Sequence, residues 1–266
     1  MNYFVSIENS YQHSWQTELL IQSFKDKGVE DSLFVSVGVD DTNKIYDCKN
    51  LSSHKNKFYF KKTNSNLSFN KWLSLLEILN KEKIFPLTIL NSHNIFCDDI
   101  PLNDMDMIFS EDALLTHDLI NGYFSDLPEE EIKKNWIKIG NTMVFNNIPI
   151  SFFEDIISYM KYFIDKKDFL GMDRAAINLS IWKNWSLFEN KKNIEIRPNA
   201  IESNMANNVV KNIINYDHGI QPSFNKIWFS KNDFAMHPDK PIECLSKIRH
   251  TKCSDFIADI AKNYLN

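Results

Sequence analysis

The sequence lacks any uninterrupted apolar run of about 18 residues, the length that a membrane-spanning helix needs. Its first residues, MNYFVSIENS, also lack the basic leader and the apolar stretch of a secretory signal. We therefore expect a protein that has no membrane partner and that stays in the cytoplasm.

Cysteine and glycine are both scarce. The four cysteines, Cys48, Cys97, Cys244 and Cys253, form no Cys-x-x-Cys pair, which favours neither a zinc site nor a disulfide framework. Glycine and alanine are rare while Asn, Lys, Ile and Phe are abundant, a bias typical of an AT-rich genome. A chain of 266 residues that is 43% hydrophobic and has no repeat or long flexible linker predicts a single domain over residues 1–266.

Positive charge is also not in excess, since the net charge is −5. The protein as a whole therefore has no general electrostatic attraction for nucleic acid. One segment, residues 54–62, differs locally, since it interleaves four lysines with Phe58, Tyr59 and Phe60. Its period is that of a strand, and an edge strand whose lysines discourage aggregation is the favoured interpretation. A nucleic-acid surface is the alternative.

The order of elements in the first 90 residues is that of an α/β protein. We predict a strand over residues 3–7, a polar loop over 8–14, a helix over 15–27 that stops at Gly28, and a parallel strand over 33–39. After the strand over 54–62, the spacing of the large apolar residues predicts a second helix over 69–79. The compact apolar run 86–90 predicts a buried parallel strand.

The later part of the sequence alternates less regularly. We predict a strand over 137–145 that is interrupted by Gly140, a helix over 150–164, a helix from Gly171 through Trp182, a strand over 212–216 and a terminal helix over 254–264. Asp173 lies at the start of its helix, where either a capping or a catalytic role fits.

Asn91-Ser92-His93 follows the buried strand 86–90 directly. Open α/β sheets bind ligands at the carboxyl ends of their strands, so this position makes the segment a candidate site. For His93 itself, a hydrogen-bonded loop histidine and a site residue are both open.

Four strings carry a family resemblance: residues 10–16 (SYQHSWQ), 69–72 (FNKW), 95–102 (IFCDDIPL) and 138–141 (KIGN). In order and spacing they resemble the hydroxyproline O-arabinosyltransferases, which are GT-A glycosyltransferases. Residues 10–16 are similar to the Ser-Gln-Trp-Gln loop of that family, 69–72 to its Asn-Arg-Pro-Trp helix start, and 138–141 to its Ile-Gly-Asn strand. The resemblance implies a GT-A-like, Rossmann-like fold with a mixed, mainly parallel sheet flanked by helices.

The resemblance also implies a nucleoside diphosphate sugar, such as a UDP-sugar, bound over the carboxyl edge of the sheet. The loop that contains Glu8 and Gln16 would approach the nucleoside, and Lys71 would contact a diphosphate oxygen. Asp173 falls where related enzymes place an acidic residue near the reacting sugar. It would orient the acceptor hydroxyl, act as the base, or stabilise positive charge on the anomeric carbon, and Arg174 beside it is a further candidate for donor binding.

The Asp-x-Asp metal motif of GT-A enzymes is replaced in this sequence. In that motif two carboxylates, together with a distant histidine, hold Mg²⁺ or Mn²⁺ against the departing diphosphate. Here Asn91 and His93 stand at the motif, and Asn215 stands at the position of the distant histidine. His93 and His218 are the candidate metal ligands, and Asn91 and His93 are also candidate donor contacts. Either a divalent cation is held differently or protein cations take its role.

The leading hypothesis is a glycosyltransferase that moves a sugar, with arabinose as the first choice, from a nucleotide donor to a hydroxyl acceptor. A protein or glycan hydroxyl and a hydroxymethylated base of phage-type DNA are both open as acceptors. Because the carboxylates are missing, the alternative is a catalytically degenerate GT-A fold that serves as a nucleotide-sugar or partner-binding module. A nucleic-acid-binding protein that uses the lysines of residues 54–62 is the third hypothesis.

Overall fold

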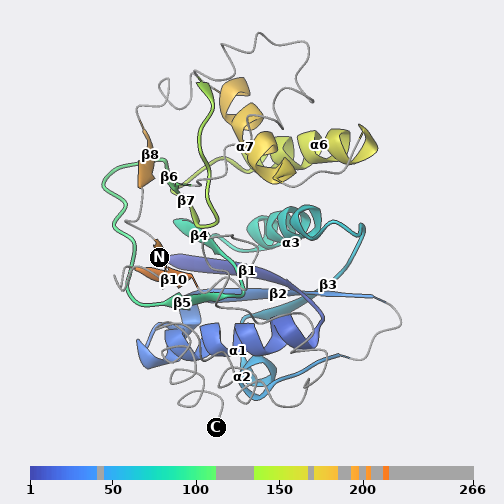
Figure 1. The fold of residues 1–266 in the computed structure, drawn as a ribbon, viewed down its shortest axis with the longest axis vertical. Coiled ribbons are helices and arrows are strands. Elements are labelled where there is room, and N and C mark those ends of the chain that lie inside the picture. The colour runs from blue at the N-terminus through green and yellow to red at the C-terminus, as the bar shows by residue number, and fades with distance from the viewer. Residues whose placement is uncertain are drawn as a thin grey trace.

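The computed structural model describes residues 1–40, 45–111, 135–166, 171–184, 193–197, 202–204 and 212–215 (Figure 1). Among these residues no helix is both long and apolar enough to cross a membrane.

A twisted sheet of seven strands runs through the middle of the fold. Its strands are β1 (Asn2–Glu8), β2 (Leu33–Val39), β3 (Lys57–Lys61), β4 (Leu87–Leu90), β6 (Met107–Ser110), β7 (Met143–Phe145) and β8 (Ile194–Arg197). Their order is β3-β2-β1-β4-β7-β6-β8. All run parallel except β7, which is antiparallel to both of its neighbours. The carboxyl ends of the other six strands therefore lie at one edge of the sheet.

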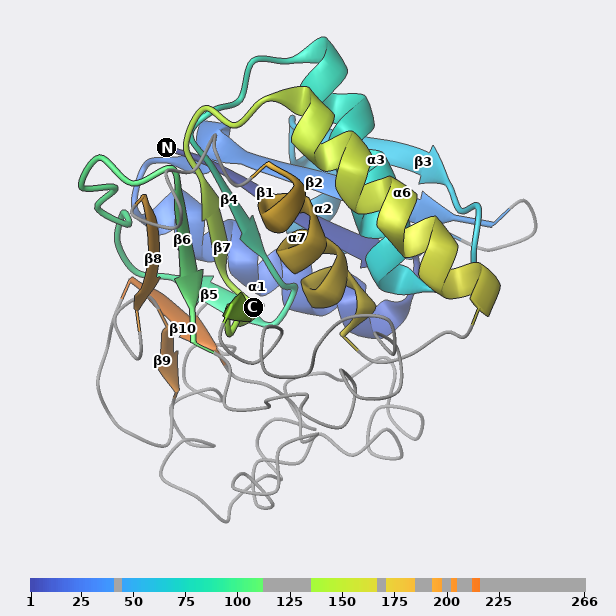
Figure 2. The same ribbon diagram turned by 90° about the horizontal axis from the view of Figure 1, so that it is seen from above.

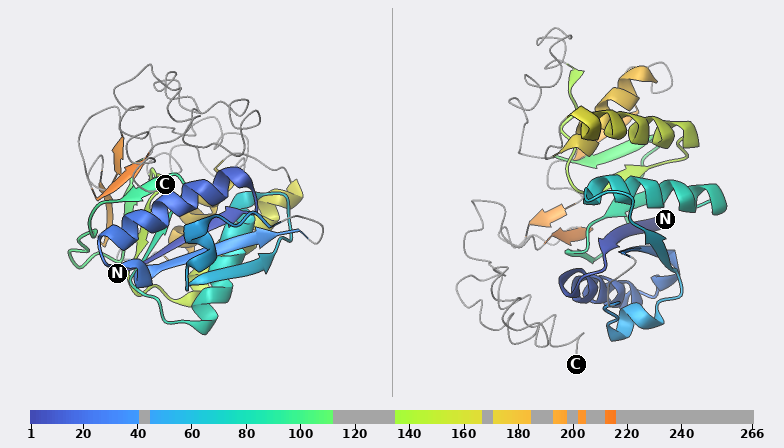
Figure 3. Two further views of the ribbon diagram at one scale, coloured as in Figure 1. Left: turned by 90° about the horizontal axis from the view of Figure 1, so that it is seen from below. Right: turned by 90° about the vertical axis from the view of Figure 1, so that its right-hand side faces the viewer.

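Helices cover both faces of this sheet. The helices α1 (Tyr11–Asp26) and α2 (Lys49–Ser53) lie on one face, and α3 (Leu67–Lys81) and α6 (Ile150–Lys166) lie on the other, as Figure 2 and the right panel of Figure 3 show. The helix α7 (Met172–Lys183) packs against α6 and contacts α3. A short 3-10 helix, η1 (Glu30–Ser32), leads into β2.

The alternation of side chains along β1 explains the two layers of core. Tyr3, Val5 and Ile7 point to the side of α1, whereas Phe4 joins the cluster formed with α3, α6 and α7. All four side chains are buried. Fully burying an aliphatic or aromatic side chain contributes about 1.5–3 kcal/mol, so the sheet is held from both faces.

A second sheet of three strands extends the carboxyl edge beside β4. It contains β5 (Asn94–Phe96), β10 (Ile213–Asn215) and β9 (Glu202–Asn204), in the order β5-β10-β9. β10 runs antiparallel to β5 and parallel to β9. Since β5 begins directly after the turn that follows β4, this sheet brings residues near 215 to that turn.

Most of the predicted elements are confirmed, with three boundary corrections. The predicted loop 8–14 is wrong beyond Ser10, because the Ser10 hydroxyl accepts from the His13 N–H and starts α1 at Tyr11. The predicted strand 54–62 is shorter, since α2 ends at Ser53 and β3 covers only Lys57–Lys61. Of the predicted strand 137–145 only residues 143–145 pair as β7. The predicted helix 254–264 lies outside the described residues.

Candidate functional site

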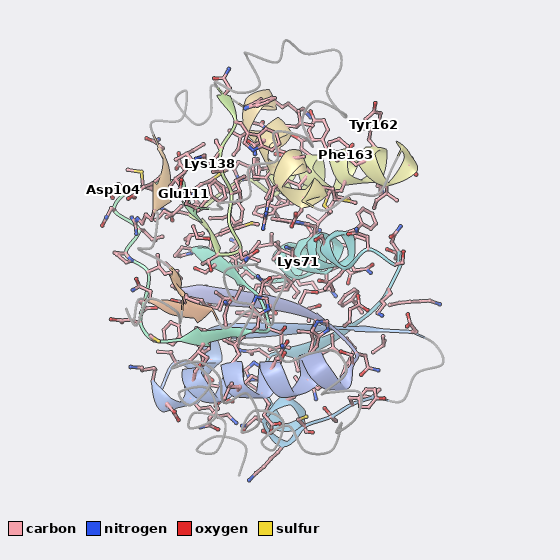
Figure 4. All side chains as sticks on the ribbon, viewed as in Figure 1. Lys71, Asp104, Glu111, Lys138, Tyr162 and Phe163 are labelled. Atoms are coloured by element: carbon pink, nitrogen blue, oxygen red, sulfur yellow. The ribbon has the colours of Figure 1, made fainter. Side chains whose placement is uncertain are left out.

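The structure joins two of the candidate residues, Lys71 and Asp173, although 102 positions separate them in the sequence. The Lys71 Nζ atom donates to Oδ2 of Asp173 at 3.0 Å, and the two side chains are only 13% and 9% exposed. Lys71 lies in the second turn of α3 (Figure 4), while Asp173 lies in the first turn of α7. Both predicted helices are confirmed, although α3 begins at Leu67 rather than at Phe69, and the two helix starts meet.

Asp173 is held as a carboxylate. Burial by itself raises its pKa, but the charges of Lys71 and Arg174 and the hydrogen bonds that both residues donate outweigh burial and leave the pKa below its usual value. The backbone N–H of Arg174 donates to Oδ1 of Asp173 at 3.0 Å. Asp173 thus accepts from a backbone N–H of the first turn of α7 and also forms a buried ion pair, and its catalytic role stays a prediction.

Arg174 extends the same group of charges toward the sheet. Its Nη2 atom donates to Oδ1 of Asn141 at 3.0 Å. Asn141 precedes β7, and Ile89 of β4 pairs with Met143 of β7, so the segment before β7 and the segment after β4 leave the sheet at the same edge. Asn141 was not predicted as a site residue, and only the family string 138–141 contains it.

The turn after β4 lies at this edge, as predicted, and it is rich in amides and hydroxyls. The Ser92 hydroxyl donates to Oε1 of Gln16 at 2.7 Å, and the Asn91 N–H donates to Oδ1 of Asn94 at 2.7 Å. The side-chain nitrogens of Gln16 and Asn94 are buried without an acceptor among the described residues. Gln16 therefore contacts the turn directly from within α1, in agreement with the helix predicted over residues 15–27.

Backbone pairing brings the second altered motif position to this turn. Asn215 of β10 pairs with Asn94 of β5, the residue directly after His93. The two positions that depart from the GT-A metal motif are thus neighbours in the fold. His218 lies outside the described residues.

Glu8 lies at the same edge but has a different partner from the one expected. At the end of β1, it forms an ion pair with Lys62, which follows β3. Lys62 also reaches Asp40, with 3.4 Å between Nζ and Oδ2. Lys62 was predicted only as part of the basic segment, and no periodicity in the sequence signals that it belongs to this edge.

The remaining lysines of residues 54–62 are mostly compensated by carboxylates. Lys55 forms an ion pair with Asp31, and Lys57 with Asp47. Among the strands that the structure describes, β3 pairs with β2 alone and therefore lies at the edge of the sheet. Both facts favour the interpretation of this segment as a protected edge over that of a nucleic-acid surface.

The described residues do not fit a divalent cation at the turn. The side chains of Asn91, Ser92 and Asn94 supply neutral oxygens and amides, and His93 supplies one imidazole. Across the described parts of the chain no three His, Cys, Asp or Glu side chains come together as metal ligands. The Asp-x-Asp at Asp104 and Asp106 precedes β6, so it lies at the opposite edge of the sheet.

Similarity to known proteins is detected through structure and not through sequence. No protein-family model matches the sequence, and a sequence search of curated proteins finds no match. The galactosyltransferase LgtC, in complex with donor and acceptor sugar analogues, matches with a TM-score of 0.50 and 9% identity over 90% of this chain and 95% of LgtC. An active-site variant of LgtC matches with a TM-score of 0.53 and 8% identity over 100% of this chain and 97% of that chain.

The fold is that of the GT-A glycosyltransferases. The sheet agrees with that fold, because its strands are parallel except for one antiparallel strand beside β4 and helices cover both of its faces. At this identity the likeness establishes the fold and not the reaction. In the GT-A fold of this chain the candidate residues lie where α/β sheets bind their ligands.

Proposed function

We propose that this chain is a glycosyltransferase that moves a sugar from a nucleoside diphosphate sugar to a hydroxyl acceptor. The observation that carries this proposal is the buried Lys71–Asp173 pair, extended by Arg174 and placed at the carboxyl edge of a GT-A fold. A buried carboxylate with two cationic neighbours at a ligand-binding edge is typical of an active site rather than of a stabilising surface pair.

The electrostatics favour one role for Asp173 over the others. A carboxylate whose pKa is lowered is a weak base, because the neighbouring cations disfavour its protonation. It remains a fixed negative charge that stabilises the positive charge developing on the anomeric carbon and orients the acceptor hydroxyl. We therefore assign Asp173 this stabilising and orienting role.

In this proposal, groups of the protein stabilise the negative charge of the departing diphosphate. Lys71 pairs with Asp173, and Arg174, whose Nη2 atom donates to Asn141, is the second cation of the group. The positive end of the α7 helix dipole adds to it. The buried side-chain nitrogens of Gln16 and Asn94 are further donors that a phosphate oxygen would satisfy. No step depends on a metal held by carboxylates.

Only the family resemblance narrows the choice of donor sugar and acceptor. Arabinose is the first sugar to test because of the similarity of residues 10–16 and 138–141 to the hydroxyproline O-arabinosyltransferases. Peptide, glycan and hydroxymethylated DNA are the acceptors to compare. The carboxylates that pair with Lys55, Lys57 and Lys62 reduce the positive charge that a DNA acceptor would meet on this side.

The test is release of nucleoside diphosphate from a panel of UDP- and GDP-sugars, including UDP-arabinose, with each acceptor class and with or without Mn²⁺. Turnover that is lost in Asp173→Ala supports the transferase. Binding of nucleotide sugar without turnover on any acceptor supports the alternative, a binding module built on the same fold. DNA binding is tested separately, by replacing Lys55, Lys57, Lys61 and Lys62 together with neutral residues. A loss of DNA binding in this variant would distinguish that function from the transferase and from the binding module.

A further inference from the structure

The turn that follows β4 alternates in burial. Asn91 and His93 are half-buried, whereas Ser92 and Asn94 are buried. The Ser92 hydroxyl donates to Oε1 of Gln16 at 2.7 Å, so the buried part of the turn is anchored on α1. The half-buried residues show that solvent reaches the turn, and the buried ones give it an interior lined by amides.

The orientation of the Asn94 amide follows from its partner. The backbone N–H of Asn91 can only donate, so the Asn94 atom that faces it at 2.7 Å is the oxygen, Oδ1. The Nδ2 group of Asn94 consequently faces elsewhere, and it meets no acceptor among the described residues. The side chain is 0% exposed, so bulk water does not solvate this donor either.

Gln16 repeats the same arrangement from the helix. Its Oε1 accepts from Ser92, its Nε2 has no acceptor in the described parts of the chain, and its side chain is also 0% exposed. A buried donor without an acceptor is costly, and native proteins leave few of them. Two such donors on one hydrogen-bonded turn therefore indicate that a ligand with oxygen acceptors completes this site.

The charge of the turn favours an anion only in the absence of carboxylates. Residues 91–97 include no Asp or Glu. The first acidic residue whose partner is known, Asp99, accepts from the Tyr3 hydroxyl at 2.7 Å, which places it near the amino end of β1 and away from the site. Without a cation, carboxylates at positions 91 and 93 would repel a diphosphate. Asn91 and His93 carry no such negative charge.

We infer that the NH2 groups of Gln16 and Asn94 bind oxygens of the donor's diphosphate, at the turn where the Asp-x-Asp motif would hold a metal. The inference rests on the proposed function for the identity of the ligand. It assigns the metal's contact to two neutral amides that the fold already orients, because each amide oxygen is occupied by the turn. Hydrogen bonds from such donors to a charged phosphate oxygen are among the stronger ones in proteins.

The test measures the binding of UDP, GDP and inorganic pyrophosphate by calorimetry, in EDTA at about pH 8, where carboxylates are ionised. Asn94→Asp keeps the oxygen that accepts from Asn91 and replaces the NH2 group by a carboxylate oxygen. Gln16→Glu makes the same change opposite Ser92. We expect each variant to weaken the binding of the probes that the wild type binds by about 10- to 100-fold.

Two further variants separate the lost donor from the added charge and from damage to the fold. Gln16→Met removes the donor without adding charge, and we expect about 10-fold weaker binding. Gln22→Glu adds a charge further along α1, at an amide whose oxygen accepts from Asn50 and whose nitrogen donates to Asp26. It should bind the probes within about threefold of the wild type. Thermal unfolding shows that each variant is folded.

The outcomes distinguish this inference from the proposed function. If the wild type binds a probe in EDTA and the Gln16 and Asn94 variants bind it equally well, water satisfies the two nitrogens and the inference alone is wrong. Wild-type binding that requires Mn²⁺ would also overturn it. If the variants weaken binding but the wild type turns over no donor, the inference stands and the binding module replaces the transferase. A wild type that binds none of the probes contradicts both.

Discussion

At the scale of single residues, the site depends on how a buried carboxylate is paired. Asp173 has two cationic neighbours, and its folded-state pKa is lower than the unfolded value of 3.8. It therefore contributes stability that is present above that value and is lost as the pH falls through its folded pKa. The same pairing keeps Asp173 ionised at neutral pH, as the role proposed for it requires.

Replacing Asp173 by asparagine tests the catalytic role with almost no change in shape. We expect Asp173→Asn to lower kcat by about 100-fold or more, since a fixed charge that stabilises the transition state is lost. Asp155→Asn is the control, because Asp155 also pairs with a lysine, Lys183, at 2.6 Å but on the exposed side of α6 and α7. Equal losses in the two variants, measured by steady-state kinetics, would remove Asp173 from the mechanism.

Replacing Lys71 by methionine tests the ion pair itself. Removing one partner of a buried pair costs about 3–5 kcal/mol, and Arg174 should reduce that cost here. We expect Lys71→Met to be less stable than the wild type above pH 4, with the difference shrinking at lower pH as Asp173 becomes protonated in both proteins. Urea unfolding at several pH values measures this. A difference that is independent of pH would show that the charge of Lys71 is not what matters.

At the scale of elements, local pattern was a good guide wherever a segment is held by its own periodicity. The apolar spacing of α3 and α6, the stop at Gly28 and the buried run of β4 follow from side-chain pattern alone, and the structure confirms them. The path of residues 137–142 could not be predicted, because Ile137 pairs with Asn178, 41 positions away, and Gly140 pairs with Ser110 of β6. The available signal was Asn178, a polar residue four positions after Arg174 on a largely buried helix.

The close contact of Gly140 with Ser110 gives a prediction about two glycines. Gly140→Ala should destabilise the protein by about 1–3 kcal/mol through overpacking, because its Cβ would meet both Oγ and the carbonyl of Ser110. Gly28→Ala meets no atom within 4 Å, so only its positive φ of 70° is strained and a cost of about 1 kcal/mol is expected. Thermal unfolding ranks the two. A larger loss at Gly28 would contradict the tight contact at Gly140.

At the scale of the whole molecule, the sheet topology brings together candidate residues that the sequence could identify only one by one. The parallel strands bring Glu8, the turn 91–94 and the start of α3 to one edge, and β7 returns Asn141 to it. Which side chains would touch across that edge, such as Lys71 with Asp173 or Glu8 with Lys62, depends on packing between distant elements. No local sequence pattern encodes such contacts. The edge at which a residue lies was therefore predictable, but the side chain with which it pairs was not.

The central claim is that this GT-A fold transfers sugar and meets the charge of the diphosphate with groups of the protein. Its most direct test is release of nucleoside diphosphate from the donor panel by the wild type, measured in EDTA and again with Mn²⁺, beside Asp173→Asn. We expect the wild type to turn over a donor in EDTA and Asp173→Asn not to do so. Turnover that requires Mn²⁺, or that survives in Asp173→Asn, or no turnover of any donor, would contradict it.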